Sequence, residues 1–158
     1  MISRIWKNIY ISGADESREI LSGKEPKHGF GYVINLSNST FIKTPAGSNI
    51  DYQHILLAPI DNTEADIRFA INTLWTMRVS SLIHRRNRKI LVHCAAGIDR
   101  SVIITAAMLM KTLKFRYILN PEYRFYALVG FVQTKRMKEP PDKKLAKQVC
   151  VLFTGDKL

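Results

Sequence analysis

The segment KILVHCAAGIDRS, from Lys89 to Ser101, decides the fold of this 158-residue chain. It begins with aliphatic residues that do not alternate with polar ones, which is typical of a strand buried on both faces of a sheet. A cysteine, three small residues and an arginine follow, and the sequence after Ser101 is apolar nearly all round a helix. The segment therefore predicts a central strand, a tight loop and a buried helix.

The loop has the features of an anion-binding site. Small residues at positions 95–97 allow a tight turn in which successive N–H groups converge on one point. The helix that begins at Ser101 directs its N-terminal dipole and its unpaired N–H groups to the same point. Arg100 adds a guanidinium group that can contact two phosphate oxygens at once. We expect Cys94 to ionise readily beside this positive charge and to act as a nucleophile.

The rest of the chain predicts an α/β fold. Runs rich in β-branched and aromatic residues predict strands over 8–13, 31–37 and 51–60. Apolar spacing predicts helices over 15–21, 63–83, 101–114, 121–137 and 141–152, and the pair Thr63 and Asp66 is typical of a helix cap. We expect one domain over residues 1–158, with a mostly parallel central sheet of about four to five strands and helices on both faces.

Composition restricts the class of protein. No apolar run approaches the roughly 20 residues needed to cross a bilayer, and the N-terminus lacks the order of charge, apolar stretch and cleavage site of a signal peptide. We expect a soluble cytoplasmic protein with no membrane span. Cys94 and Cys150 are too few for a disulfide scaffold or a cysteine-rich zinc site, and the histidines lack ligand spacing. We therefore expect no metal and no cofactor.

The formal net charge of +11 indicates an anionic partner without identifying it. Phosphorylated protein, nucleic acid and acidic lipid all fit, and so does a surface that is charged for solubility alone. The basic run HRRNRK, residues 84–89, has the same two interpretations: a solvated turn or a segment that attracts substrate.

The pattern HCxxGxxRS, formed by His93, Cys94, Gly97, Arg100 and Ser101, resembles the signature loop of the cysteine-dependent phosphatases. The resemblance extends along nearly the whole chain. The segments NIYISG, YVINLS, ILLAPIDNTEADI and ILVHCAAGIDRSVIITAAMLM are similar in order and spacing to those of poxvirus-type dual-specificity phosphatases. The resemblance implies a small catalytic domain that acts on phosphorylated proteins.

The resemblance also implies how the loop works. Cys94 attacks phosphorus to form a phosphocysteine, and the Arg100 side chain stabilises the transition state together with the loop N–H groups. The phosphate-binding residues that it implies are Ala95, Ala96, Gly97, Ile98, Asp99 and Arg100. Splitting one displacement into two easier steps in this way is covalent catalysis.

Three further residues take roles from the resemblance. Asp61 directly follows LLAPI, 33 residues before Cys94, and is the expected general acid and later general base. We prefer it to Asp66, which we place at the helix start. His93 is expected to order the loop and support the thiolate, and Ser101 to donate a hydrogen bond to the departing sulfur.

The chain departs from the family pattern at two positions. Asp99 replaces an uncharged residue and resembles some phosphoinositide phosphatases; it is a second acid, or it orders the loop and orients Arg100. Val102 replaces a common glycine, which affects helix packing more than chemistry. We see no counterpart of the N-terminal extension through which some poxvirus-type members pair, and we infer no obligate oligomer.

Three functions remain open from the sequence. The first is a protein phosphatase that acts on phosphotyrosine and on phosphoserine or phosphothreonine. The second is a phosphoinositide or RNA 5′-phosphatase that uses the same cysteine loop. Asp99 and the net positive charge suggest this function. The third is a phosphate-binding module without turnover.

Overall fold

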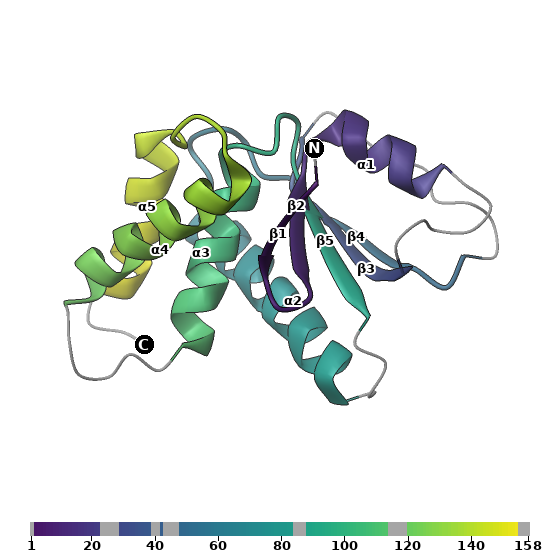
Figure 1. The fold of residues 1–158 in the computed structure, drawn as a ribbon. Helices are drawn as coiled ribbons and strands as arrows, with labels where there is room; N and C mark the ends of the chain where they lie inside the picture. The colour runs from purple at the N-terminus through teal and green to yellow at the C-terminus, as the bar shows by residue number, and fades with distance from the viewer. Residues whose placement is uncertain are drawn as a thin grey trace.

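The computed structural model describes residues 2–22, 29–38, 42, 48–83, 88–113 and 120–154. Five strands form one sheet in the order β1-β2-β5-β3-β4 (Figure 1). Their bounds are β1 Ser3–Trp6, β2 Ile9–Ser12, β3 Phe30–Asn35, β4 Asp51–His54 and β5 Lys89–His93. β1 pairs antiparallel with β2, and all the other pairings are parallel. The expected mostly parallel sheet with β5 at its centre is confirmed.

The helices cover the two faces of this sheet unequally. Their bounds are α1 Ala14–Leu21, α2 Glu64–Ile83, α3 Arg100–Thr112, α4 Pro121–Arg136 and α5 Lys143–Thr154. Figure 1 shows α1 on one side of the sheet and α2 to α5 together on the other. α2 and α3 contact β5 directly, while α4 and α5 pack against α3. The prediction of helices on both faces is confirmed.

Strand β5 has no polar alternation because both its faces are buried. Ile90 and Val92 belong to the larger apolar core on the side of α2 and α3, and Leu91 belongs to the smaller core that includes Leu21 of α1. Leu21 and the three strand residues have no solvent exposure. Burial of each such side chain contributes about 1.5–3 kcal/mol, so the position of β5, and of the loop that follows it, is strongly determined.

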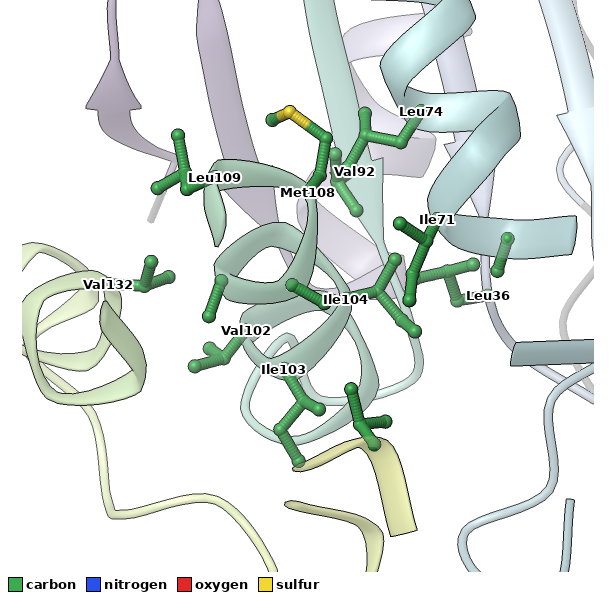
Figure 2. Packing of buried hydrophobic residues seen from close by; sticks show 14 of the residues in the cluster. Leu36, Ile71, Leu74, Val92, Val102, Ile103, Ile104, Met108, Leu109 and Val132 are labelled. Carbon is green, nitrogen blue, oxygen red and sulfur yellow. The ribbon is translucent and has the colours of Figure 1, made fainter. Parts of the chain in front are cut away.

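Helix α3 is buried along most of its length. Every residue from Arg100 to Leu109 is buried. Figure 2 shows Ile104 near Ile71 of α2 on one side of α3, and Val102 on the side toward Val132 of α4. Val102, at a position where the resemblance predicts glycine, therefore fills a helix–helix contact.

The structure differs from the sequence-based expectations at the sheet edges. β1 is absent from those expectations; Ser3 and Ile5 are buried and Arg4 between them is exposed, but the run is too short to indicate a strand by its pattern. The predicted strand over 51–60 ends at His54, although Ile55 and Leu57 remain buried beyond it. Residues 84–87 of the basic run lie outside the described residues.

The described helices were compared in length and hydropathy with the roughly 20 apolar residues that a membrane-spanning helix needs. None of these helices in the described segments is long and apolar enough to cross a lipid bilayer.

Candidate active site

The HCAAGIDRS loop lies at the carboxyl end of the sheet, between β5 and α3. His93 pairs in register with Ser12 of β2 and Asn35 of β3, so three parallel strands end together here. The Leu36 N–H donates to the His93 carbonyl at 2.8 Å, and the Ala14 N–H donates to the Ala95 carbonyl at 2.9 Å. The carboxyl edge of a parallel sheet is the usual position for a ligand site in such folds.

Gly97 is the conformational centre of the loop. Its φ of +71° lies in the left-handed region, which favours glycine. A Cβ atom there would lie 2.5 Å from the carbonyl oxygen of Ser12 and 2.8 Å from the nitrogen of Gly13. Both the backbone angle and the close approach of β2 therefore require glycine.

Cys94 and Ser101 lie at opposite ends of the loop and meet across it. The Cys94 Sγ is 3.4 Å from the Ser101 Oγ, within hydrogen-bond distance for sulfur, and both residues are buried. Ser101 lies in the first turn of α3, where N–H groups and the helix dipole favour negative charge. The arrangement places a hydroxyl group and a helix N-terminus at the sulfur.

Arg100 is held beside the loop by two groups that the sequence did not indicate. Its Nη1 donates to the Leu57 carbonyl at 2.8 Å and to the Asn38 Oδ1 at 3.3 Å. A guanidinium group has five N–H donors. No other hydrogen bond of Arg100 is found among the described residues, so its remaining donors are available to an anion.

His93 is buried without exposure beside Cys94. Burial lowers its pKa from 6.5 to about 4; the nearby Cys94 backbone opposes the shift and the charge of His54 adds to it. Neither ring nitrogen has a hydrogen-bond partner within the described residues. The imidazole is therefore neutral at neutral pH. His93 can order the loop by packing, but it brings no positive charge to the sulfur.

Asp61 lies on an exposed loop and has a left-handed φ of +63°. The side chain of its neighbour Asn62 builds this loop: its Oδ1 accepts from the Ala58 N–H at 2.7 Å, and its Nδ2 donates to the Ala58 carbonyl at 2.9 Å. Leu57, which holds Arg100, is the residue before Ala58. Asp61 is thus exposed to solvent on a loop whose base contacts Arg100.

Asp66 belongs to a helix cap, as expected. Its N–H donates to the Thr63 Oγ1 at 3.1 Å, and the Thr63 hydroxyl donates to the Asp66 Oδ2 at 2.5 Å. This pair of contacts stabilises the start of α2. Because Asp66 is engaged in this cap, Asp61 remains the candidate general acid of this segment.

Asp99 connects the loop to the segment before α5. Its Oδ1 accepts from the Asp142 N–H at 2.8 Å, and the Asp142 Oδ1 in turn accepts from the Lys144 N–H at 2.6 Å. Of the two interpretations of Asp99, this contact favours loop ordering.

Arg136 is part of the site, although no sequence pattern singled it out. Its Nε donates to the Gly97 carbonyl at 3.1 Å, its Nη2 pairs with the Glu16 Oε2 at 3.0 Å, and its Nη1 donates to the Ser3 Oγ at 3.4 Å. The residue is 1% exposed. A cation in the last turn of a helix is common, so nothing local in the sequence distinguished it.

Comparison with known proteins is consistent with this geometry. The family model described as "Dual specificity phosphatase, catalytic domain" matches residues 10–150. The dual specificity protein phosphatase OPG106 of vaccinia virus (strain Western Reserve) is 32% identical over 143 residues, which cover 87% of this chain and 78% of that protein. The match to the protein of the Copenhagen strain covers 72% of this chain and 61% of the relative.

Solved structures share the fold. OH1 from the Orf virus, described as a tyrosine phosphatase with triple substrate specificity, has a TM-score of 0.72 at 21% identity and covers 98% of this chain and 87% of its own. The human tyrosine phosphatase-like serine/threonine/tyrosine-interacting protein has a TM-score of 0.69 at 23% identity, with 94% and 92% covered.

Proposed function

The chain belongs to the dual specificity phosphatase family, and from this we propose that it hydrolyses phosphotyrosine and phosphoserine or phosphothreonine in proteins through a phosphocysteine intermediate. The observation that carries the proposal is the contact between the Cys94 Sγ and the Ser101 Oγ at 3.4 Å, at the N-terminus of α3. It combines a nucleophile, a hydroxyl donor and a helix dipole at one point.

In the first step the Cys94 thiolate attacks phosphorus. The S–P bond forms while the bond from phosphorus to the ester oxygen breaks, and the Asp61 carboxyl group gives its proton to the departing oxygen. The N–H groups of residues 95–100 and the free donors of Arg100 stabilise the negative charge on the transferred phosphoryl group. The Leu57 and Asn38 contacts hold the guanidinium in place for this contact.

In the second step water hydrolyses the phosphocysteine. The Asp61 carboxylate, now deprotonated, takes a proton from the water as the oxygen attacks phosphorus. The S–P bond breaks, and inorganic phosphate and the thiolate are formed. The Ser101 hydroxyl donates to the departing sulfur and stabilises its charge.

Variants of the proposed nucleophile test turnover against simple binding. The alternative is a phosphate-binding module of the same fold that does not turn over its ligand. Cys94→Ser is expected to abolish hydrolysis of p-nitrophenyl phosphate while the protein still binds phosphate. Activity of this variant equal to that of the parent protein would exclude Cys94 from the reaction.

A substrate panel tests the proposed substrate class. Rates for phosphotyrosine, phosphoserine and phosphothreonine peptides are compared with those for a 5′-triphosphate RNA and an inositol-lipid headgroup, to which the net charge of +11 would also be attracted. We expect the peptides to be preferred. Faster hydrolysis of the RNA or the headgroup would contradict the proposed substrate class and would show that the cysteine loop acts on that substrate instead.

The proposed mechanism needs a reduced thiol. Cys94 and Cys150 are both free and buried in the structure. We therefore propose that the protein acts in a reducing compartment such as the cytoplasm.

A further inference from the structure

Arg136 occupies a position that has an energetic cost. It is the largest of the fully buried side chains in the described chain. Removing a guanidinium group from water costs several kcal/mol unless its charge and its donors are satisfied. Glu16 supplies the opposite charge at 3.0 Å, but its side chain is itself 26% exposed and also accepts from the Gly13 N–H at 2.6 Å. The cation is thus paired with a carboxylate that is shared with the backbone.

The other contact of Arg136 acts on the shape of the loop. Its Nε holds the Gly97 carbonyl at 3.1 Å, and the Ala14 N–H holds the Ala95 carbonyl at 2.9 Å. Two carbonyls of the phosphate-binding loop are therefore bound by groups outside it. With these carbonyls fixed, the N–H groups of the loop remain for an anion on its inner side.

Arg136 also lies within electrostatic reach of Cys94. Burial lowers the pKa of Arg136, and the interaction with Cys94 opposes this shift, which identifies the sulfur as an electrostatic neighbour of the guanidinium. His93 contributes no charge because it is neutral. Arg136 is therefore a second cation of the site, on the side of the loop that faces α4 and away from solvent.

We propose that Arg136 is a positioning residue of the phosphate-binding loop, which fixes the Gly97 carbonyl and supplies buried positive charge that stabilises the anionic sulfur of Cys94. The role given to Arg136 rests on the proposed function, because it supposes that Cys94 is the nucleophile. Its test does not depend on turnover.

The test is the rate of alkylation of Cys94 by iodoacetamide, measured by mass spectrometry in a Cys150→Ala background. At pH 6 we expect Arg136→Met to slow alkylation about tenfold, because one nearby positive charge is lost. At pH 9, where an ordinary cysteine is largely ionised, the same variant should react nearly as fast as the parent. Arg136→Lys keeps the charge and should recover most of the rate at pH 6.

Two controls separate charge from structure. Lys135→Met removes an exposed cation from the adjacent position and should leave the rate unchanged at both pH values. Glu16→Gln removes the opposing charge and should leave the rate at pH 6 unchanged or raise it, whereas a purely structural network predicts a decrease.

The inference is overturned if Arg136→Met slows alkylation equally at pH 6 and pH 9, or not at all. A parent protein that fails to hydrolyse phosphate esters but shows the predicted alkylation pattern would contradict the proposed function alone.

A second inference comes from a cavity of about 370 Å³ where α2, α3, α4 and α5 meet. Among the described residues, its wall contains three cations from three helices, Arg68, Lys111 and Arg124, and no carboxylate. Ile71 and Leu152 add buried apolar surface. Lys111 is 11 residues along α3 from Arg100, roughly 16 Å at 1.5 Å per residue, so the cavity is distinct from the phosphate-binding loop.

Two of the cations around this cavity differ in the kind of partner that they have. Arg68 pairs with Glu64, which lies outside the wall, at 2.6 Å. Lys111 has only neutral partners within the described segments: its Nζ donates to the Asn72 Oδ1 at 2.7 Å and lies 4.8 Å from the centre of the Trp75 ring. From the Lys111 ammonium group, which has no carboxylate partner within the described segments, and the apolar surface beside it, we infer that the cavity binds a small organic anion with an apolar body.

The probe for this site is the aryl sulfonate 8-anilinonaphthalene-1-sulfonate. We expect saturable binding of one dye per chain by fluorescence, weakened roughly tenfold by Lys111→Glu. Lys144→Glu, on the exposed side of α5, is the matched control and should have no effect. The Arg100→Ala variant should still bind the dye. Binding that is lost in Arg100→Ala, or unchanged in Lys111→Glu, would overturn the assignment of this cavity.

Discussion

Substitution of Gly97 by alanine tests how closely the loop depends on the approach of β2. The new Cβ atom would lie 2.5 Å from the Ser12 carbonyl oxygen, whereas real Cβ contacts are essentially never below 3.0 Å. Loop and strand must therefore separate by at least about 0.5 Å, in a core that does not deform freely. Alanine at φ +71° adds roughly 1–2 kcal/mol of backbone strain.

Gly29 provides the matched control. It has nearly the same φ, +69°, but within the described part of the chain no atom beyond its own neighbours lies within 4 Å of the position that a Cβ atom would take there. Gly29→Ala should therefore show the backbone cost alone, roughly 1–2 kcal/mol, which lowers Tm by a few degrees. Gly97→Ala should show that cost and the clash together, about 3–4 kcal/mol in total.

The assays are thermal unfolding and hydrolysis of p-nitrophenyl phosphate. Because displacement of a positioned group by even 1 Å costs about 100-fold in rate, we expect kcat/KM of Gly97→Ala to fall about that much, while Gly29→Ala keeps its activity. Equal losses of stability and equal activities in the two variants would refute the argument from close approach.

Three further predictions concern single side chains. The folded-state pKa of His93, about 4, lies below its usual value of 6.5. As pH drops from 6.5 to 4 the unfolded chain takes up the proton first, so the protein loses stability, by about 3 kcal/mol from His93. Urea unfolding at several pH values should show that the unfolding free energy depends less steeply on pH in His93→Gln. Asp61→Asn should lower kcat/KM by about 100-fold or more and remove the alkaline limb of its pH profile, because the general acid must be protonated to act. Asp99→Asn should chiefly lower Tm because it weakens the bond to the Asp142 N–H. An unchanged profile in Asp61→Asn would shift the acid role to Asp99. Ser101→Ala should slow hydrolysis of the intermediate more than its formation, giving a burst of p-nitrophenol in stopped-flow traces, and a linear trace would argue against its role at the sulfur.

The sequence predicted the features that depend on neighbouring residues. The strand, loop and helix around Cys94 follow from local apolar pattern and small residues, and the Thr63 and Asp66 pair capped α2 as expected. Each of these features depends on residues that are close in sequence, so a local sequence pattern indicates it.

The features that the sequence did not predict depend on contacts between distant segments. Arg136 reaches Gly97 across 39 positions, and Arg100 reaches Leu57 across 43. The neutrality of His93 arises from its burial between β2 and β3. No local pattern records which carbonyl a distant guanidinium will meet, so these contacts became visible only in the folded chain.

The most direct test of the account is acid quenching during turnover of p-nitrophenyl phosphate, followed by mass spectrometry of the peptide that contains Cys94. The account predicts a phosphoryl group on the Cys94 sulfur, accumulating further in Ser101→Ala and absent from Cys94→Ser. Rapid hydrolysis with Cys94 unmodified at every quench time, and continued activity in Cys94→Ser, would contradict it.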